Sequence, residues 1–241
     1  MDLNEVLHRR CLCRCQSKYG TDKNYIHSYI DEFYNPLFKV IEPPKKLLEV
    51  GLARGASLLL WQETFSSAKL TGIDINASTD MHPDFYTLLN NENVKIIIGD
   101  AYAPSLFPLD YFDLIIDDGP HTLLSQISAL SFIKNLSAAG LLIIEDVPQV
   151  ARRLSILKSK LPEADREFIG AVSFYHNSGR YDDSIIYFTR DRQVLSWLEK
   201  HYSGLQGYYS KNISVWVFVR SFHLFIRTYR KIFGRAKRES H

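Results

Sequence analysis

Cysteine is scarce in this sequence, with three residues among 241. They fall together as Cys11, Cys13 and Cys15, and no other cysteine is present to pair with them. This count excludes a disulfide framework and favours a reducing cytosol. The spacing C-x-C-x-C also differs from that of zinc sites. We therefore expect reduced thiols on a short N-terminal helix.

Long apolar runs are also missing. No window approaches 18 uninterrupted apolar residues, which argues against a membrane-spanning helix. The first ten residues, MDLNEVLHRR, contain no apolar core, so a secretory signal is not expected. The sequence therefore predicts a cytoplasmic protein whose contact with a membrane, if any, is peripheral.

An excess of one charge sign is also missing, because basic and acidic residues nearly balance, but the charges are unevenly distributed. The net charge is +2, yet the chain from Arg220 onward carries seven Lys and Arg against one Glu. Apolar residues recur at helical spacing between Ser214 and Phe233. This pattern predicts a basic amphipathic helix that docks on the domain, on a second subunit as a homo-oligomer contact, or on an anionic membrane. Nothing else in the sequence supports nucleic-acid binding.

Short apolar runs, in contrast, are regular. They span residues 46–50, 69–75, 94–100, 112–117 and 140–146. Runs of this length without alternation are typical of strands buried on both faces of a parallel sheet. Helical patterns follow the first run at residues 56–65 and the fourth at residues 121–137, the latter closed by Gly140.

This alternation predicts an α/β fold: a doubly wound, mostly parallel seven-stranded sheet. Residues 167–176 and 182–190 flank the turn-forming "NSGRY" and predict a C-terminal antiparallel hairpin. We expect a helical lead-in over residues 1–45, one domain over residues 46–203 and a basic extension over residues 204–241.

Each of the five runs ends in an acid, where ligands of open α/β sheets bind. The acids are Glu49, Asp74, Asp100, Asp117 with Asp118, and Glu145 with Asp146. A single acid at such a position is usually a solvated turn residue. Five equivalent positions are poorly explained by turn chemistry alone.

The first crossover, "LLEVGLARGASL" at residues 47–58, indicates the cofactor. Its glycines form G-x-x-x-G rather than the dinucleotide-binding G-x-G-x-x-G. Glu49 can attract an ammonium group, Asp74 can accept hydrogen bonds from ribose hydroxyls, and Asp100 with the Ala101 backbone can face an adenine. Together with Gly51, Gly55 and Ser57 in the turn, these residues point to S-adenosylmethionine.

Several motifs resemble those of class I S-adenosylmethionine-dependent methyltransferases. More narrowly, the chain resembles metal-dependent sugar O-methyltransferases acting on macrolide and rhamnosyl products, a group that includes cephalosporin-hydroxylase-like proteins. The matching stretches are "KYGTDKNYIHSY", "LLEVGLARGASL", "GIDI", "IIDDGPH" and "IEDV", within about residues 18 to 190. Ala53-Arg54 and Pro120 depart from the family pattern. The resemblance implies a Rossmann-like methyltransferase fold and places Thr21 and Lys23 in a flap over the cofactor carboxylate.

The resemblance also implies a magnesium ion, with manganese as the alternative. Carried over, Asp118, Glu145 and Asp146 are the metal ligands, His121 is the general base and Asp117 lines the methionine part of the cofactor. Electrostatics agrees, because three carboxylates facing one point need a cation between them. Pro120 fits the first position of a helix, so we expect His121 in its first turn, where the positive helix end keeps the ring neutral.

The sequence thus predicts methylation of a hydroxyl on a sugar, a glycan or another small molecule. A metal-bound hydroxyl loses its proton more readily, and His121 would accept that proton. Two other functions stay open. One is a catechol-type O-methyltransferase, whose acidic acceptor needs no histidine base, and the other is a non-catalytic cofactor-binding scaffold.

Overall fold

The computed structural model describes residues 2–76, 80–103 and 110–203. By compactness the chain divides into Met1–Lys200 and His201–His241, and the fold and the site belong to the first unit. The predicted basic amphipathic helix falls at residues 214–233, outside the described residues. Along the described part of the chain, no helix is long and apolar enough to cross a bilayer.

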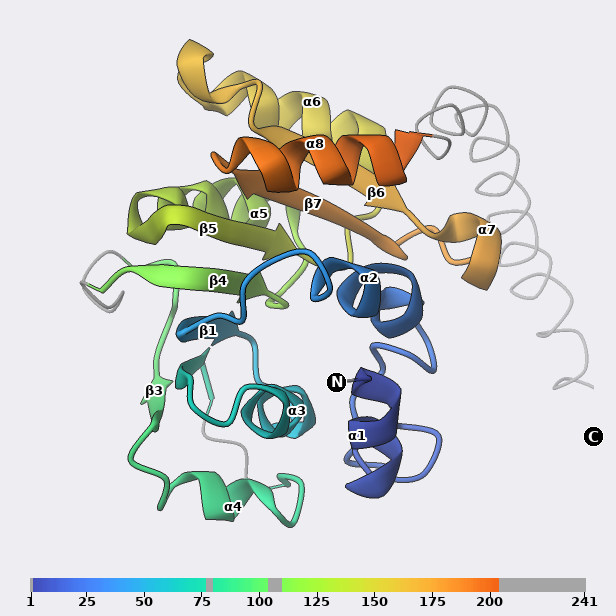
Figure 1. Ribbon diagram of the computed structural model, residues 1–241, viewed down its shortest axis with the longest axis vertical. Helices are drawn as coiled ribbons and strands as arrows, with labels where there is room; N and C mark the ends of the chain where they lie inside the picture. Colours follow the sequence, from blue (N-terminus) through green and yellow to red (C-terminus); the bar gives the residue numbers. More distant parts are fainter. Residues whose placement is uncertain (1, 77–79, 104–109, 204–241) are drawn as a thin grey trace, which may run out of the picture. The chain divides into compact units, whose positions relative to one another are not determined.

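Seven strands form one sheet in the order β3-β2-β1-β4-β5-β7-β6 (Figure 1). The strands are β1 (Lys46–Val50), β2 (Lys69–Asp74), β3 (Val94–Ile98), β4 (Phe112–Asp117), β5 (Leu136–Ile144), β6 (Ile169–Ser173) and β7 (Ser184–Thr189). The first five are parallel, while β7 is antiparallel to both β5 and β6. The predicted doubly wound sheet with its C-terminal hairpin is therefore confirmed.

Helices cover the sheet and lead into it. They are α1 (Leu3–Arg9), α2 (Asn35–Leu37), α3 (Ala56–Thr64), α4 (Phe85–Leu88), α5 (Leu123–Ala129), α6 (Val150–Lys160), α7 (Tyr175–Ser178) and α8 (Arg192–His201). A π-helical segment, η1 (Ile30–Tyr34), and two 3₁₀ helices, η2 (Leu130–Asn135) and η3 (Glu163–Asp165), accompany them. α1 lies beside α3, and α5 lies beside α6 (Figure 1). Successive residues Leu114, Ile115 and Ile116 point to opposite faces of β4, and all three are fully buried. The apolar runs predicted strands here because both faces are covered.

The helix predicted over residues 121–137 is shorter than expected. α5 gives way to η2, which ends at Asn135, and Gly140 lies inside β5 rather than closing a helix. The pairing of β4 with β5 shifts register between Phe112 and Leu114. A Cβ at Gly140 would come within 2.8 Å of the Phe112 carbonyl oxygen. Glycine at this position therefore allows β4 and β5 to approach each other closely.

The expectation for the cysteines is wrong in two respects. α1 ends at Arg9, so all three cysteines follow the helix, and Cys11 has a left-handed φ of 53°. A disulfide joins Cys13 to Cys15, and Cys11 alone keeps a free thiol. The chain bends here, which brings two cysteines only two residues apart to a Cα separation of 5.2 Å, a normal span for a disulfide.

Candidate active site

The glycine turn after β1 packs directly against the end of β4. Gly51 has a φ of 85°, and a Cβ there would lie 2.1 Å from the Asp118 carbonyl oxygen. The Asp118 amide donates to the Val50 carbonyl at 2.9 Å. Gly55, with a φ of 81°, is the cap residue of α3. Glycine is required at Gly51 because only a residue without a side chain permits both the φ and the contact.

Asp74 fixes the same turn from the neighbouring strand. Its Oδ2 accepts from the amides of Leu52 at 2.8 Å and Ala53 at 3.2 Å. Its Oδ1 accepts from the Asn76 amide at 2.9 Å. The carboxylate predicted to bind ribose hydroxyls therefore holds the turn in this structure. Asp100 likewise accepts from the Tyr102 amide at 2.9 Å.

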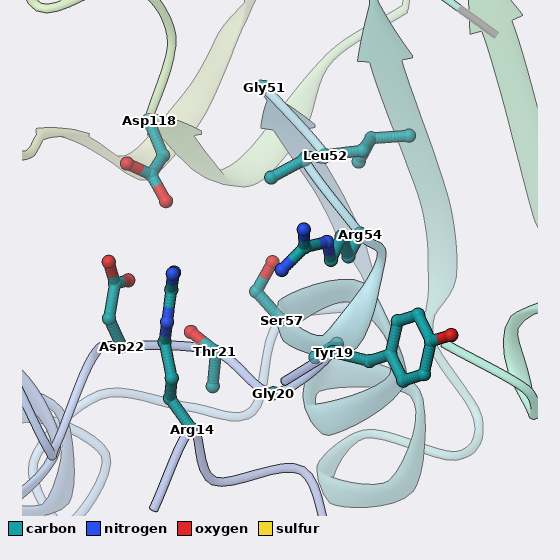
Figure 2. Close-up of a pocket in the computed structure, with 12 residues that line it drawn as sticks. Arg14, Tyr19, Gly20, Thr21, Asp22, Gly51, Leu52, Arg54, Ser57 and Asp118 are labelled. Atoms are coloured by element: carbon teal, nitrogen blue, oxygen red, sulfur yellow. The ribbon is translucent and has the colours of Figure 1, made fainter. Parts of the chain in front are cut away.

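A cavity of about 270 Å³ opens between the glycine turn and the N-terminal segment (Figure 2). Its lining comes from residues 14 and 19–22, the turn after β1 and the start of α3, and Asp118. The two walls are linked, because Arg54 donates to the Lys18 carbonyl at 2.5 Å. Of the residues predicted to bind cofactor or metal, the cavity brings together Thr21, Gly51, Ser57 and Asp118.

The other predicted cofactor residues do not line this cavity. Glu49 is fully buried and accepts from the Trp61 indole at 3.1 Å. Burial raises the pKa of Glu49 to about 7, although the Lys23 ammonium opposes the shift. Asp117 is also buried and accepts from the Tyr102 hydroxyl at 2.6 Å. Burial raises the pKa of Asp117 to about 7 as well.

Lys23 occupies a different place from the predicted flap. Its ammonium is 1% exposed, lies 2.8 Å from Asp118 Oδ2 and contacts Glu145 Oε2. Glu145 is fully buried, and its Oε1 accepts from the Tyr34 hydroxyl at 2.5 Å. Burial lowers the pKa of Lys23, but Asp118 and Glu145 outweigh it and leave that pKa well above the ordinary value. Lys23 is therefore a buried cation between two of the predicted metal ligands.

His121 lies between Asp118 and Asp146. Its Nε2 is 3.8 Å from Asp118 Oδ1 and 3.6 Å from Asp146 Oδ2. One potential metal-ligand atom from each of Asp118, His121 and Asp146 lies within 4.8 Å of the other two. Glu145 does not belong to this group. The backbone of both His121 and Asp146 is in the left-handed region, with φ of 54° and 52°. Such strain is typical of functional sites.

The prediction that His121 lies in the first turn of a helix is wrong. α5 begins at Leu123, and its N-cap is Thr122, whose side chain accepts from the Ser125 amide at 3.0 Å. Threonine is a strong N-cap residue, so the helix starts after the histidine. His121 is held instead through its carbonyl, which accepts from Arg153 at 2.8 Å.

Two tyrosines of the site were not found from the sequence. Tyr34 binds Glu145, and the Tyr29 hydroxyl donates to Asp146 Oδ1 at 2.8 Å while accepting from the Asp146 amide at 3.1 Å. His27, noted in "KYGTDKNYIHSY", has its Nδ1 3.4 Å from the same Asp146 oxygen. Burial, followed by the Asp118 charge, raises the pKa of Asp146. No local pattern in residues 27–34 marks these contacts, because their partners lie more than 100 residues away.

No protein-family model matches the sequence, and no match was found among curated proteins. Among solved structures, the chain is similar to an S-adenosylhomocysteine-bound methyltransferase of Podospora anserina, at 18% identity over 78% of this chain and 87% of that one (TM-score 0.49). It is also similar to a protein from Staphylococcus aureus described as a caffeoyl-CoA O-methyltransferase, at 15% identity over 78% and 90% (0.46).

A further similar structure is the MycE methyltransferase of the mycinamycin biosynthetic pathway, solved with Mg and S-adenosylhomocysteine. Identity is 19% over 78% of this chain and 49% of that one, with a TM-score of 0.45. The fold class rests on the strand order, which matches that of a methyltransferase fold.

Proposed function

We propose that the chain is an S-adenosylmethionine-dependent O-methyltransferase acting on a hydroxyl of a sugar or glycan-containing acceptor. One observation carries the proposal: Asp118 belongs both to the cavity beside the glycine turn and to the cluster around His121. A methyl donor in the cavity would therefore lie next to a histidine able to act as a base. Both features lie at the carboxyl edge of the sheet, where ligands of such folds bind.

In this mechanism the chain's residues bind the cofactor and remove one proton. Gly51 and the side chains of Thr21 and Ser57 line the cavity that would hold the cofactor. His121 Nε2 would accept the proton of the acceptor hydroxyl as its oxygen takes the methyl group, with the bond from methyl to sulfur broken and S-adenosylhomocysteine released. The nearby Asp146 carboxylate stabilises the imidazolium that forms. S-adenosylmethionine, when bound, supplies the methyl group on a sulfonium.

The implied magnesium ion fits two of its three predicted ligands. Asp118 and Asp146 converge, and Mg²⁺ is commonly held by one or two carboxylates with water completing its shell. Glu145 does not fit, because Lys23 and Tyr34 hold its two oxygens below the surface. We therefore propose that Asp118 and Asp146 hold the ion, which when bound would make the acceptor hydroxyl more acidic.

We expect titration calorimetry to detect S-adenosylhomocysteine binding and no NAD binding. Asp74→Ala should weaken that binding by about 1–3 kcal/mol, because it removes the acceptor that holds the glycine turn. Glu92→Ala, an exposed acid elsewhere, should leave affinity unchanged. Tight NAD binding without S-adenosylhomocysteine binding would contradict the proposed cofactor.

The metal assignment predicts unequal effects of removing each acid. Asp118→Asn and Asp146→Asn should each weaken Mn²⁺ binding at least about tenfold, measured by electron paramagnetic resonance. Glu145→Gln should retain the affinity, since its oxygens already have partners. Circular dichroism would first establish that each variant is folded. Equal losses of Mn²⁺ affinity in all three variants would mean that all three carboxylates bind the ion.

A further inference from the structure

The lining of the cavity carries charges of both signs. Arg14 and Arg54 supply guanidinium groups, and Asp22 and Asp118 supply carboxylates. Figure 2 shows the side chains of Arg14, Asp22 and Asp118 directed toward one space, with the Ser57 hydroxyl beside it. A neutral ligand would not need this arrangement. A zwitterion matches it, because its ammonium and carboxylate can each face the opposite charge.

Of the basic groups near this space, Arg14 alone is uncommitted. Lys23 is held by Asp118 and Glu145. Arg54 donates to the Lys18 carbonyl and lies 3.5 Å from Asp80. Over the described ranges 2–76, 80–103 and 110–203, the Arg14 guanidinium has no hydrogen bond or ion pair. It is therefore ready for a ligand without first breaking a protein contact.

The backbone beneath Arg14 is held on both sides. Its amide donates to the Thr21 carbonyl at 2.9 Å, and Cys13 forms a bridge with Thr21. The disulfide between Cys13 and Cys15 encloses Arg14 in a closed loop. A restrained backbone loses less conformational entropy when its side chain binds a ligand.

Resting on the proposed function, we propose that Arg14 binds the carboxylate at the α-amino-acid end of the cofactor, while Asp22 accepts hydrogen bonds from its ammonium. A guanidinium donates two parallel hydrogen bonds to a carboxylate, which a lysine ammonium does not do. The cavity would thus distinguish nucleosides that carry an amino-acid group from those that lack it.

The test compares two ligands by titration calorimetry. S-adenosylhomocysteine has the amino-acid end, whereas 5′-methylthioadenosine keeps the adenosine and sulfur without it. Arg14→Met should weaken S-adenosylhomocysteine binding by about 10–100-fold, as expected for lost hydrogen bonds to a charged group. Affinity for 5′-methylthioadenosine should stay unchanged. Arg14→Lys should fall between wild type and Arg14→Met, and Arg152→Met, an exposed arginine on α6, should match wild type.

Different results overturn different claims. If wild type binds neither ligand, the proposed cofactor is wrong and the role of Arg14 falls with it. If wild type binds S-adenosylhomocysteine but Arg14→Met binds it equally well, only the role of Arg14 is overturned. Equal weakening of both ligands also overturns that role, because it would mean that the variant has altered the whole cavity.

Discussion

Lys23→Met should lower the free energy of unfolding at pH 7 by about 3–5 kcal/mol, the usual cost of removing one partner of a buried ion pair. The variant leaves Glu145 fully buried and Asp118 partly buried without the ammonium that lies between them. Urea unfolding followed by circular dichroism measures the change. Lys160→Met, an exposed lysine at the end of α6, should stay within about 0.5 kcal/mol of wild type.

The loss should also depend on pH. Without Lys23, burial raises the folded-state pKa of the unpaired acids above the unfolded value. Such groups favour folding at low pH, and that contribution is lost as pH rises above the unfolded pKa. The deficit of Lys23→Met should therefore shrink on acidification from pH 7 toward pH 5. A deficit below 1 kcal/mol at pH 7 would mean that the ammonium does not neutralise these carboxylates.

His121→Asn should lower turnover by about 10²–10⁴-fold, the range for loss of a general base. Asparagine is the better replacement than alanine, because it tolerates the left-handed φ of 54° at this position. The acceptor would come from a methyl-transfer screen over sugar nucleotides, rhamnosyl glycans and catechols. Partial recovery with rising pH is expected, since hydroxide can replace the missing base.

Binding measurements separate this effect from a structural one. S-adenosylhomocysteine affinity of His121→Asn should equal that of wild type, because His121 does not line the cofactor cavity. His8→Ala, on the exposed side of α1, should retain full turnover. Near-normal turnover by His121→Asn would remove the histidine from the mechanism and favour a catechol-type acceptor.

The sheet could be predicted because its signal is local. All five apolar runs become strands, β1 to β5. β1, β4 and β5 are largely buried, which requires apolar residues at most positions, whereas β3 lies at the edge of the sheet and has no buried residue. The glycine turn could also be predicted, because the positive φ of 85° at Gly51 is a local requirement that favours glycine. Strands and turns can therefore be predicted where the residues that determine them are neighbours in the sequence.

The orientation of the acids could not be predicted in this way. Glu145 and Asp146 follow β5 as neighbours, yet one points into the core toward Tyr34 and the other toward His121. The contact that decides this involves Lys23, which is 122 residues from Glu145. The crowding of carboxylates did predict a cation. A lysine of the chain fills part of that role, and the family pattern had assigned it to cofactor binding.

The Lys23 contacts also bear on the order in which the chain acquires its structure. Lys23 leaves the ribosome before its partners Asp118 and Glu145, which lie 95 and 122 residues later. Closing loops of that length costs entropy that only the completed strand ends offset. We therefore expect the Lys23 contacts to form only after β4 and β5. Lys23 is thus synthesised before its partners but makes its native contacts only after they have formed.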